Sequence, residues 1–263
     1  MIKIVNLQKR FKKRAGREDF LLDIQSLLIQ ENEIVYFVGP NGSGKTVLLS
    51  LIQGEIDCDS GEVDIIQNDL DRKINLLSLE PFKRSKFLGF IPQESDEALI
   101  NEMNMIEHVL VGLNRVEKLS WFFPRPRNLL KVKKAVEQFG MGFENRLYEP
   151  VGNLSGGERQ VLAFCLATLN KPLMLLLDEF TSALDPEMAE KVLKLVISFI
   201  RESKLSAIIV THRHKEAIQN ADRIIILHKG KPFRELKRND PDFNEIALKN
   251  IFSQLYNTTL IST

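Results

Sequence analysis

Residues 34–52 constrain this chain more than any other stretch, because they combine an apolar run, a glycine-rich turn and a second apolar segment. Residues 34–38 are β-branched or aromatic and predict a buried strand, whereas residues 47–52 have the apolar periodicity of a helix. The turn between them fits G-x-x-x-x-G-K-[ST], the pattern of a phosphate-binding loop. Its residues are Gly39, Pro40, Asn41, Gly42, Ser43, Gly44, Lys45 and Thr46, followed by Val47.

The residue types in this loop suit a polyphosphate. Glycines let the backbone direct several N–H groups inward, and a helix that begins near Lys45 adds its positive end. Lys45 is expected to reach the β- and γ-phosphates, and the Thr46 hydroxyl to ligate Mg²⁺. A glycine-rich turn that binds nothing is the simpler alternative, but Lys-Thr at the right place between strand and helix argues against it.

The composition limits the class of protein. The 263 residues allow one large domain or two small ones, and the 44% apolar and 27% charged content is ordinary for a soluble globular protein. A net charge of +1 argues against nonspecific electrostatic binding to nucleic acid. Cys58 and Cys165 lack metal-ligand spacing and are expected to be reduced, which suits a cytoplasmic protein. Without an apolar run of about 20 residues, we expect no membrane span.

Strand and helix patterns alternate along the chain, which predicts an α/β sheet. Lys9 to Arg17 is expected to be a basic loop, residues 68–86 look irregular, and the helix after the phosphate loop should end at Gly54. Asp185 and Pro186 are expected to begin a helix that runs to Glu202. Strands are expected at 2–7, 20–29, 63–66, 87–91, 173–177 and 206–210, a hairpin at 224–236, and helices within 94–167 and at 243–255.

Two carboxylates follow the apolar strand predicted at residues 173–177. In a phosphate-loop ATPase, a carboxylate at such a strand end completes Mg²⁺ coordination, and its neighbour can orient or deprotonate the attacking water. We assign Asp178 to the metal and Glu179 to the water. Two acids that only end a strand are the simpler interpretation, which the phosphate loop upstream disfavours.

Residues 154–160, Leu-Ser-Gly-Gly-Glu-Arg-Gln, resemble the signature motif of the nucleotide-binding subunits of ABC transporters. The resemblance covers nearly the whole chain. It implies that Ser155, Gly156, Gly157 and Glu158 bind the γ-phosphate of an ATP held by a second copy. It further implies that Phe11, or alternatively Phe20, stacks on adenine. It implies that Gln93 senses the γ-phosphate and belongs to the metal site, and that His212 is the switch histidine. Residues 182–185, which end in Asp185, would form the D-loop. His108, His214 and His228 are expected to be structural or solvent-facing.

The resemblance also implies a fold. This is the α/β phosphate-loop NTPase fold of ABC ATPases, with a RecA-like mixed-sheet core, an antiparallel β subdomain and an inserted α-helical subdomain. The expected single domain, 1–263, has its core with the β subdomain at 1–93 and 168–240, the helical subdomain at 94–167 and a helical tail at 241–263.

The family's function sets the expected partners. With ATP and Mg²⁺ as cofactors, two copies pair head to tail, and the homodimer drives a separate integral membrane permease from the cytoplasmic face of the membrane. Residues 84–185 look most like importers of amino-acid-like solutes, which work with an extracytoplasmic substrate-binding protein. A lipoprotein or peptide exporter, and a soluble ABC-type ATPase acting on ribosomes or DNA, are the alternatives. A GTPase would need an N-K-x-D motif, which residues 170–173 do not match.

Two positions depart from the family pattern, and one segment stays open. Val47 stands where a second Ser or Thr is usual, so we expect slightly weaker ATP binding. Phe180 replaces a common proline, which puts the local turn in doubt. The segment Trp121–Arg127 is expected to fill the helical lobe's small core or, alternatively, to contact a membrane partner.

Overall fold

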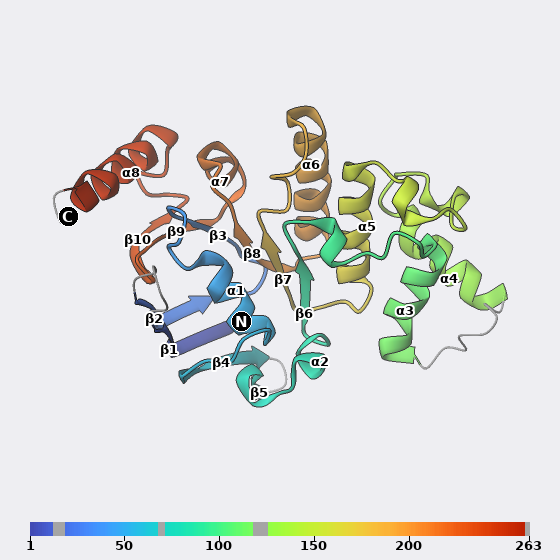
Figure 1. The fold of residues 1–263 in the computed structure, drawn as a ribbon, viewed down its shortest axis with the longest axis horizontal. Coiled ribbons are helices and arrows are strands. Elements are labelled where there is room, and N and C mark those ends of the chain that lie inside the picture. Colours follow the sequence, from blue (N-terminus) through green and yellow to red (C-terminus); the bar gives the residue numbers. More distant parts are fainter. Residues whose placement is uncertain (13–18, 68–71, 118–125, 261–263) are drawn as a thin grey trace. The chain divides into compact units, whose positions relative to one another are not determined.

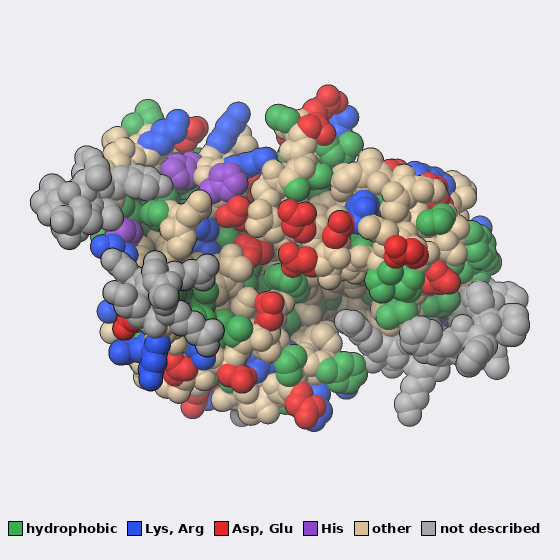
Figure 2. All heavy atoms as spheres, viewed as in Figure 1, with side chains coloured by type: hydrophobic (Ala, Val, Ile, Leu, Met, Phe, Trp, Pro, Cys, Tyr) green, Lys and Arg blue, Asp and Glu red, His purple; other side chains and the backbone are tan. Residues whose placement is uncertain are grey.

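Two stretches far apart in sequence, Met1–Ser85 and Lys204–Thr263, form one compact unit (unit 1), and Lys86–Ser203 form a second (unit 2; Figure 1). The computed structural model describes residues 1–12, 19–67, 72–117 and 126–260. Across these ranges no helix has the length and apolar character needed to cross a membrane. Acidic and basic side chains are both exposed on the face seen in Figure 2, in keeping with the net charge of +1.

Unit 1 contains an antiparallel sheet with the strand order β2-β1-β4-β5 (Figure 1). Its strands are β1 (Ile2–Phe11), β2 (Phe20–Ile29), β4 (Ser60–Gln67) and β5 (Arg72–Asn75). The pairing of β1 with β4 shifts register between Val5 and Gln8, where Asn6 has a φ of 49°. Alternate residues of β1, such as Ile2 and Ile4, are buried, so one face of the sheet covers the core.

Strands β10-β9-β3-β8 of unit 1 are mixed, because β3 is parallel to both neighbours and β9–β10 is an antiparallel hairpin. Every residue of β3 (Ile34–Val38) and β8 (Ser206–Val210) is buried, as expected for parallel strands covered on both faces. The other elements are β9 (Arg223–His228), β10 (Lys231–Lys237), α1 (Lys45–Gln53), α7 (His214–Asn220) and α8 (Glu245–Leu260).

Unit 2 places helices around a parallel strand pair, β6 (Leu88–Ile91) and β7 (Met174–Asp178). Its core includes the rings of Phe139, Phe164 and Phe199, whose centroids lie 5.2–5.7 Å apart. The helices are α3 (Met105–Glu117), α4 (Pro126–Glu137), α5 (Gly156–Thr168) and α6 (Pro186–Glu202), with short 3-10 turns at Ser95–Glu97, Phe143–Asn145 and Val151–Asn153.

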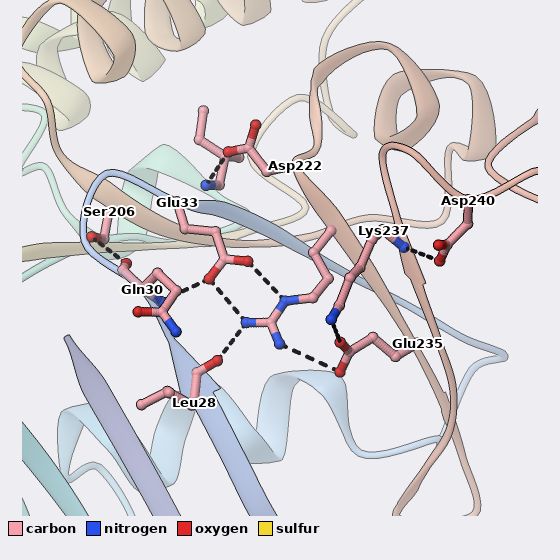
Figure 3. A network of polar contacts seen from close by, with 10 residues as sticks. Leu28, Gln30, Glu33, Ser206, Asp222, Glu235, Lys237 and Asp240 are labelled. Atoms are coloured by element: carbon pink, nitrogen blue, oxygen red, sulfur yellow. Dashed lines mark hydrogen bonds and ion pairs between the residues drawn. The ribbon is translucent and has the colours of Figure 1, made fainter.

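A polar network fixes the start of β3 in unit 1 (Figure 3). The Arg223 guanidinium donates to both carboxylate oxygens of Glu33, at 2.8 and 2.9 Å, and to the Leu28 carbonyl. Glu33 also accepts from the Gln30 N–H at 2.7 Å, and Asp222 accepts from the Ile34 N–H at 2.8 Å. The turn between β2 and β3 is therefore tied to the beginning of β9.

Local sequence signals for helix and turn ends are confirmed. Helix α1 ends at Gly54 with a φ of 90°, and Asn32 takes the left-handed conformation expected of its turn. Asp185 caps α6, with Pro186 at the first helical position. Both Cys58 and Cys165 are free thiols, and burial raises the pKa of Cys165 to about 12.

Two predictions are wrong. Lys9, Arg10 and Phe11 belong to β1 rather than to a loop, because β1 and β2 stay paired as far as Phe11 and Phe20. Residues 68–86 are not irregular throughout. They contain β5, held by its pairing with β4, and α2 (Pro81–Arg84), preceded by a 3-10 turn at Leu76–Ser78. Helix α7 was not predicted at all.

Arg84 is a buried cation that closes the end of α1. Its side chain donates to the carbonyls of Leu51 at 2.9 Å, Ile52 at 3.3 Å and Leu79 at 2.9 Å. Burial lowers the pKa of the guanidinium, and the negative end of the helix dipole offsets part of the desolvation cost. A Cβ on Gly54 would lie 2.8 Å from Arg84 Cζ, so the glycine makes room for this contact.

Arg84→Met should lower the free energy of unfolding by about 2–4 kcal/mol, because buried carbonyls lose their donors. Chemical denaturation measures the change. Lys83→Met is the matched control, since Lys83 is exposed on the same helix, and its effect should stay within about 0.5 kcal/mol. Equal effects of the two substitutions would contradict the capping role.

Candidate functional site

The phosphate loop leaves the end of buried strand β3 and enters α1. Gly42 and Gly44 have φ values of 76° and 103°, which side-chain-bearing residues rarely adopt. Among the described residues, no side chain caps the start of α1, so its first N–H groups point into the loop. Lys45 Nζ donates to the carbonyls of Gly39 at 2.9 Å and Pro40 at 3.2 Å. The ammonium is thus held beside the cradle that an anion would fill.

Neighbouring elements of unit 1 support the loop closely. A Cβ on Gly39 would lie 2.3 Å from the Leu227 carbonyl oxygen of β9. In the turn after β9, the Gly230 N–H donates to the Ser43 carbonyl at 3.0 Å. Ser43 Oγ is buried and has no hydrogen-bond partner among the described residues. An unpaired hydroxyl inside such a loop fits a site in which the hydroxyl would donate a hydrogen bond to a phosphate oxygen.

Phe11 and Phe20, the two candidates for adenine stacking, lie next to each other. They are directly paired across β1 and β2, with ring centroids 6.2 Å apart. Phe20 packs toward the loop, because a Cβ on Gly44 would lie 2.9 Å from its Cζ. The Phe11 side chain is more open, at 38% exposure. The arrangement favours Phe11 as the stacking ring and Phe20 as its support.

His212 shares one sheet edge with the phosphate loop. Phe37 of β3 pairs in register with Val210 of parallel β8, so the two strands end together. The Thr211 N–H donates to the Phe37 carbonyl at 3.2 Å, and His212 follows as an exposed residue. Two of the other three histidines have structural surroundings: both ring nitrogens of His108 are hydrogen-bonded, and His214 packs on Phe252. The third, His228, lies with its ring 6.3 Å from that of Phe233.

In unit 2, Asp178 and Glu179 come to the same edge as Gln93. Ile91 of β6 pairs in register with Leu177 of β7, and each of these side chains follows within two residues. Asp178 is buried, whereas Glu179 is partly exposed and has a φ of 41°, a strained value for a non-glycine residue.

The turn after Glu179 forms despite the departure from proline at Phe180. The Ser182 N–H donates to the Glu179 carbonyl at 2.8 Å, and the Phe180 ring is buried. A buried ring thus anchors this turn, so the doubt raised by Phe180 is resolved.

The signature segment, residues 154–160, begins α5 with a capping box. The Ser155 N–H and hydroxyl donate to Glu158 Oε2 at 2.8 and 2.9 Å. Ser155 and Gly156 are exposed, so the helix start faces solvent. A Cβ on Gly157 would lie 2.4 Å from Met188 Cγ, and the Met188 N–H donates to Asp185 Oδ1 at 3.0 Å. The signature and D-loop segments are therefore in contact.

The strand pair is joined to the signature helix near Gln93. Gln160 Nε2 donates to the Pro92 carbonyl at 3.2 Å, and both groups are buried. Gln93 itself is exposed. This bond gives the start of the Gln93 loop a fixed place on α5.

The sequence did not reveal two supporting residues, Gly230 and Arg146. Gly230 was visible only as a turn residue, and Arg146, which binds Glu158, stands in no recognisable motif. The Trp121–Arg127 segment lies outside the described residues, apart from the backbone of its last two residues, where α4 begins. Most of the predicted basic loop, residues 13–18, also lies outside them.

A family model described as "ABC transporter" matches residues 22–182, more than half of the chain. The chain belongs to the ABC transporter family. This cassette is 30% identical over 242 residues to the tyrosine transport ATP-binding protein of Clostridioides difficile, covering 92% of this chain and 94% of that protein. The lipoprotein-releasing system ATP-binding protein LolD of Rickettsia felis is 32% identical, with coverages of 80% and 87%. Against several other import ATP-binding proteins, the cassette spans 59–62% of their length.

A solved structure agrees with the family assignment. The ATP-binding cassette MJ0796, in a dimer bound to ADP and Pi, superimposes with a TM-score of 0.75 at 28% identity, covering 91% of this chain and all of that one. The predicted fold class, the α/β ABC ATPase fold, is confirmed. The cassette is accordingly an ATPase that uses ATP with Mg²⁺. The phosphate-loop geometry and the unpaired Ser43 hydroxyl fit that nucleotide.

Gly230→Ala should weaken ATP binding by tenfold or more, as measured with a fluorescent nucleotide. A Cβ there would lie 1.9 Å from the Leu21 carbonyl oxygen, so the turn and its bond to Ser43 must move. Gly140→Ala is the control: Gly140 also has a positive φ, of 64°, but a Cβ there meets nothing within 4 Å. That control should cost about 1 kcal/mol of stability and leave affinity unchanged.

Proposed function

We propose that the cassette powers solute import as a homodimer on the cytoplasmic face of the membrane, coupled to a separate integral permease. The observation that carries this proposal is the start of α5. Ser155 and Gly156 are exposed there, at a helix N-terminus suited to an anion. The same chain also carries a complete phosphate loop. Two copies paired head to tail would let each signature segment meet the triphosphate on the other's loop.

The chain's own residues supply the chemistry. Backbone N–H groups of Gly42 to Lys45 and the Lys45 ammonium hold the phosphates. Thr46 and Asp178, with Gln93, are the residues that would hold Mg²⁺, and the ion would supply positive charge to neutralise the phosphates.

Two further residues act on the attacking water and on the γ-phosphate. Glu179 accepts the proton of the attacking water as the general base. His212, beside the loop, orients the γ-phosphate. Loss of phosphate removes the shared anion, and the pair opens.

Import is favoured over export by the likeness to six proteins named as import ATP-binding proteins, and a relative that is covered almost completely is named for tyrosine transport. On that likeness we infer an amino-acid-like solute, and we propose an extracytoplasmic substrate-binding protein as a further partner. Lipoprotein release is the second candidate, favoured by the likeness to LolD. Purification with the native membrane subunit, followed by its identification, separates the two. A cassette that purifies with no membrane protein would instead support the soluble ATPase alternative.

Glu179→Gln should retain ATP binding but reduce turnover by at least about 100-fold, because an amide cannot accept the proton. Added ATP should then trap a dimer, seen by size-exclusion chromatography. Glu187→Gln is the matched control: Glu187 is an exposed residue of α6 whose carboxylate pairs with Lys191, and this variant should hydrolyse ATP normally. Native turnover by Glu179→Gln would refute the assignment.

Val47→Thr should tighten ATP binding by roughly two- to tenfold, because its hydroxyl adds a hydrogen bond to the α-phosphate. Equilibrium titration with nucleotide measures the change. Val47→Ala is the control for altered packing, since it has no hydroxyl. Affinity that does not rise in Val47→Thr would show that backbone N–H groups already satisfy that phosphate.

A further inference from the structure

Arg146 connects the loop before the signature segment to the capping box of α5. Its Nε and Nη2 donate to the two carboxylate oxygens of Glu149, at 2.7 and 3.1 Å. Its Nη1 pairs with Glu158 Oε1. Glu149 is itself held in place, because its N–H donates to the Arg146 carbonyl and its carbonyl accepts from the Met105 N–H. The Glu149 carboxylate thus orients the Arg146 guanidinium toward Glu158.

Glu158 brings a negative charge to the place where an anion should bind. Burial would raise the pKa of this carboxyl, but the hydrogen bonds from Ser155 and Arg146 outweigh it and hold the pKa below its usual range. The carboxylate is therefore ionised and lies one hydrogen bond from the Ser155 hydroxyl. Without a compensating cation, it would repel an incoming triphosphate.

The Ser155 hydroxyl must change partners when a nucleotide arrives. In the isolated chain it donates to Glu158 Oε2, which also accepts from the Ser155 N–H. Once the hydroxyl turns toward a phosphate oxygen, Glu158 keeps that N–H and Arg146 as its donors. Because Arg146 binds the other oxygen, Oε1, it can hold the carboxylate in place during this exchange.

We infer that Arg146 is a positioning residue of the signature half-site: it neutralises and anchors Glu158 so that Ser155 and the start of α5 accept the triphosphate of a second copy. The inference rests on the head-to-tail pairing proposed above. Arg146 touches no nucleotide in this scheme and acts through Glu158. Its effect should therefore depend on the Glu158 charge.

A double-mutant cycle in the Glu179→Gln background tests this dependence, with ATP-driven dimerisation measured by analytical ultracentrifugation. Arg146→Gln should raise the ATP concentration needed for half-maximal pairing by about tenfold. When Glu158→Gln is also present, which removes the charge but keeps an acceptor oxygen, the same substitution should change it less than about twofold. Arg201→Gln, on the exposed end of α6, is the control and should not change pairing.

A purely structural role would give a different pattern. Arg146→Gln would then weaken pairing equally with and without Glu158→Gln, and that result, or no effect at all, overturns the inference. If Arg146→Gln does not fold, Arg146→Lys in the same cycle should show a severalfold loss that Glu158→Gln again relieves. If the Glu179→Gln parent does not pair with ATP, the proposed pairing is itself wrong, which distinguishes that failure from failure of the Arg146 role.

Discussion

The pairing of β3 with a parallel strand on each side is the constraint on which the nucleotide half of this protein depends. Because β8 and β9 run in the same direction as β3, their carboxyl ends meet at one edge. The phosphate loop, His212 and the Gly230 turn all follow from those ends. At the opposite end, Arg223 and Glu33 tie β3 to β9 (Figure 3). Both ends of β3 are thereby held by neighbouring elements, and the phosphate loop begins at one of these ends.

In unit 2 the same rule applies to the parallel strands β6 and β7, whose carboxyl ends also meet at one edge. The registered ends of β6 and β7 bring Gln93 to the edge that carries Asp178 and Glu179. The left-handed backbone of Glu179 is strained, and the buried Phe180 ring with the following turn holds it. The bond from Gln160 to the Pro92 carbonyl then joins this edge to the signature helix. The loop that contains Gln93 is therefore attached to α5.

The sequence predicts features whose cause is local. Gly54, Asn32 and Asp185 act on their own turn of backbone, so their roles were predictable. The phosphate loop could be named from its own pattern, whereas the signature half-site was named from the resemblance to ABC ATPases. Strand β5 and helix α2 were missed because β5 exists through its pairing with β4, and Arg84 ties the segment to carbonyls 32 and 33 positions away. Gly230 was missed as a support because its partner, Ser43, is distant in sequence. Arg146 was missed although Glu149 and Glu158 are near it in sequence, because single-residue propensities do not show which charged side chains pair across a loop.

Each half of the proposed site has one key donor that already bonds within the chain. Lys45 donates to the carbonyls of Gly39 and Pro40, and Ser155 donates to Glu158. A triphosphate would therefore exchange hydrogen bonds at these groups rather than add them. The net gain must come from replacing neutral or shared acceptors with charged phosphate oxygens, which form stronger bonds. The same exchange would make the proposed pairing reversible, since loss of phosphate would let each donor return to a partner in its own chain.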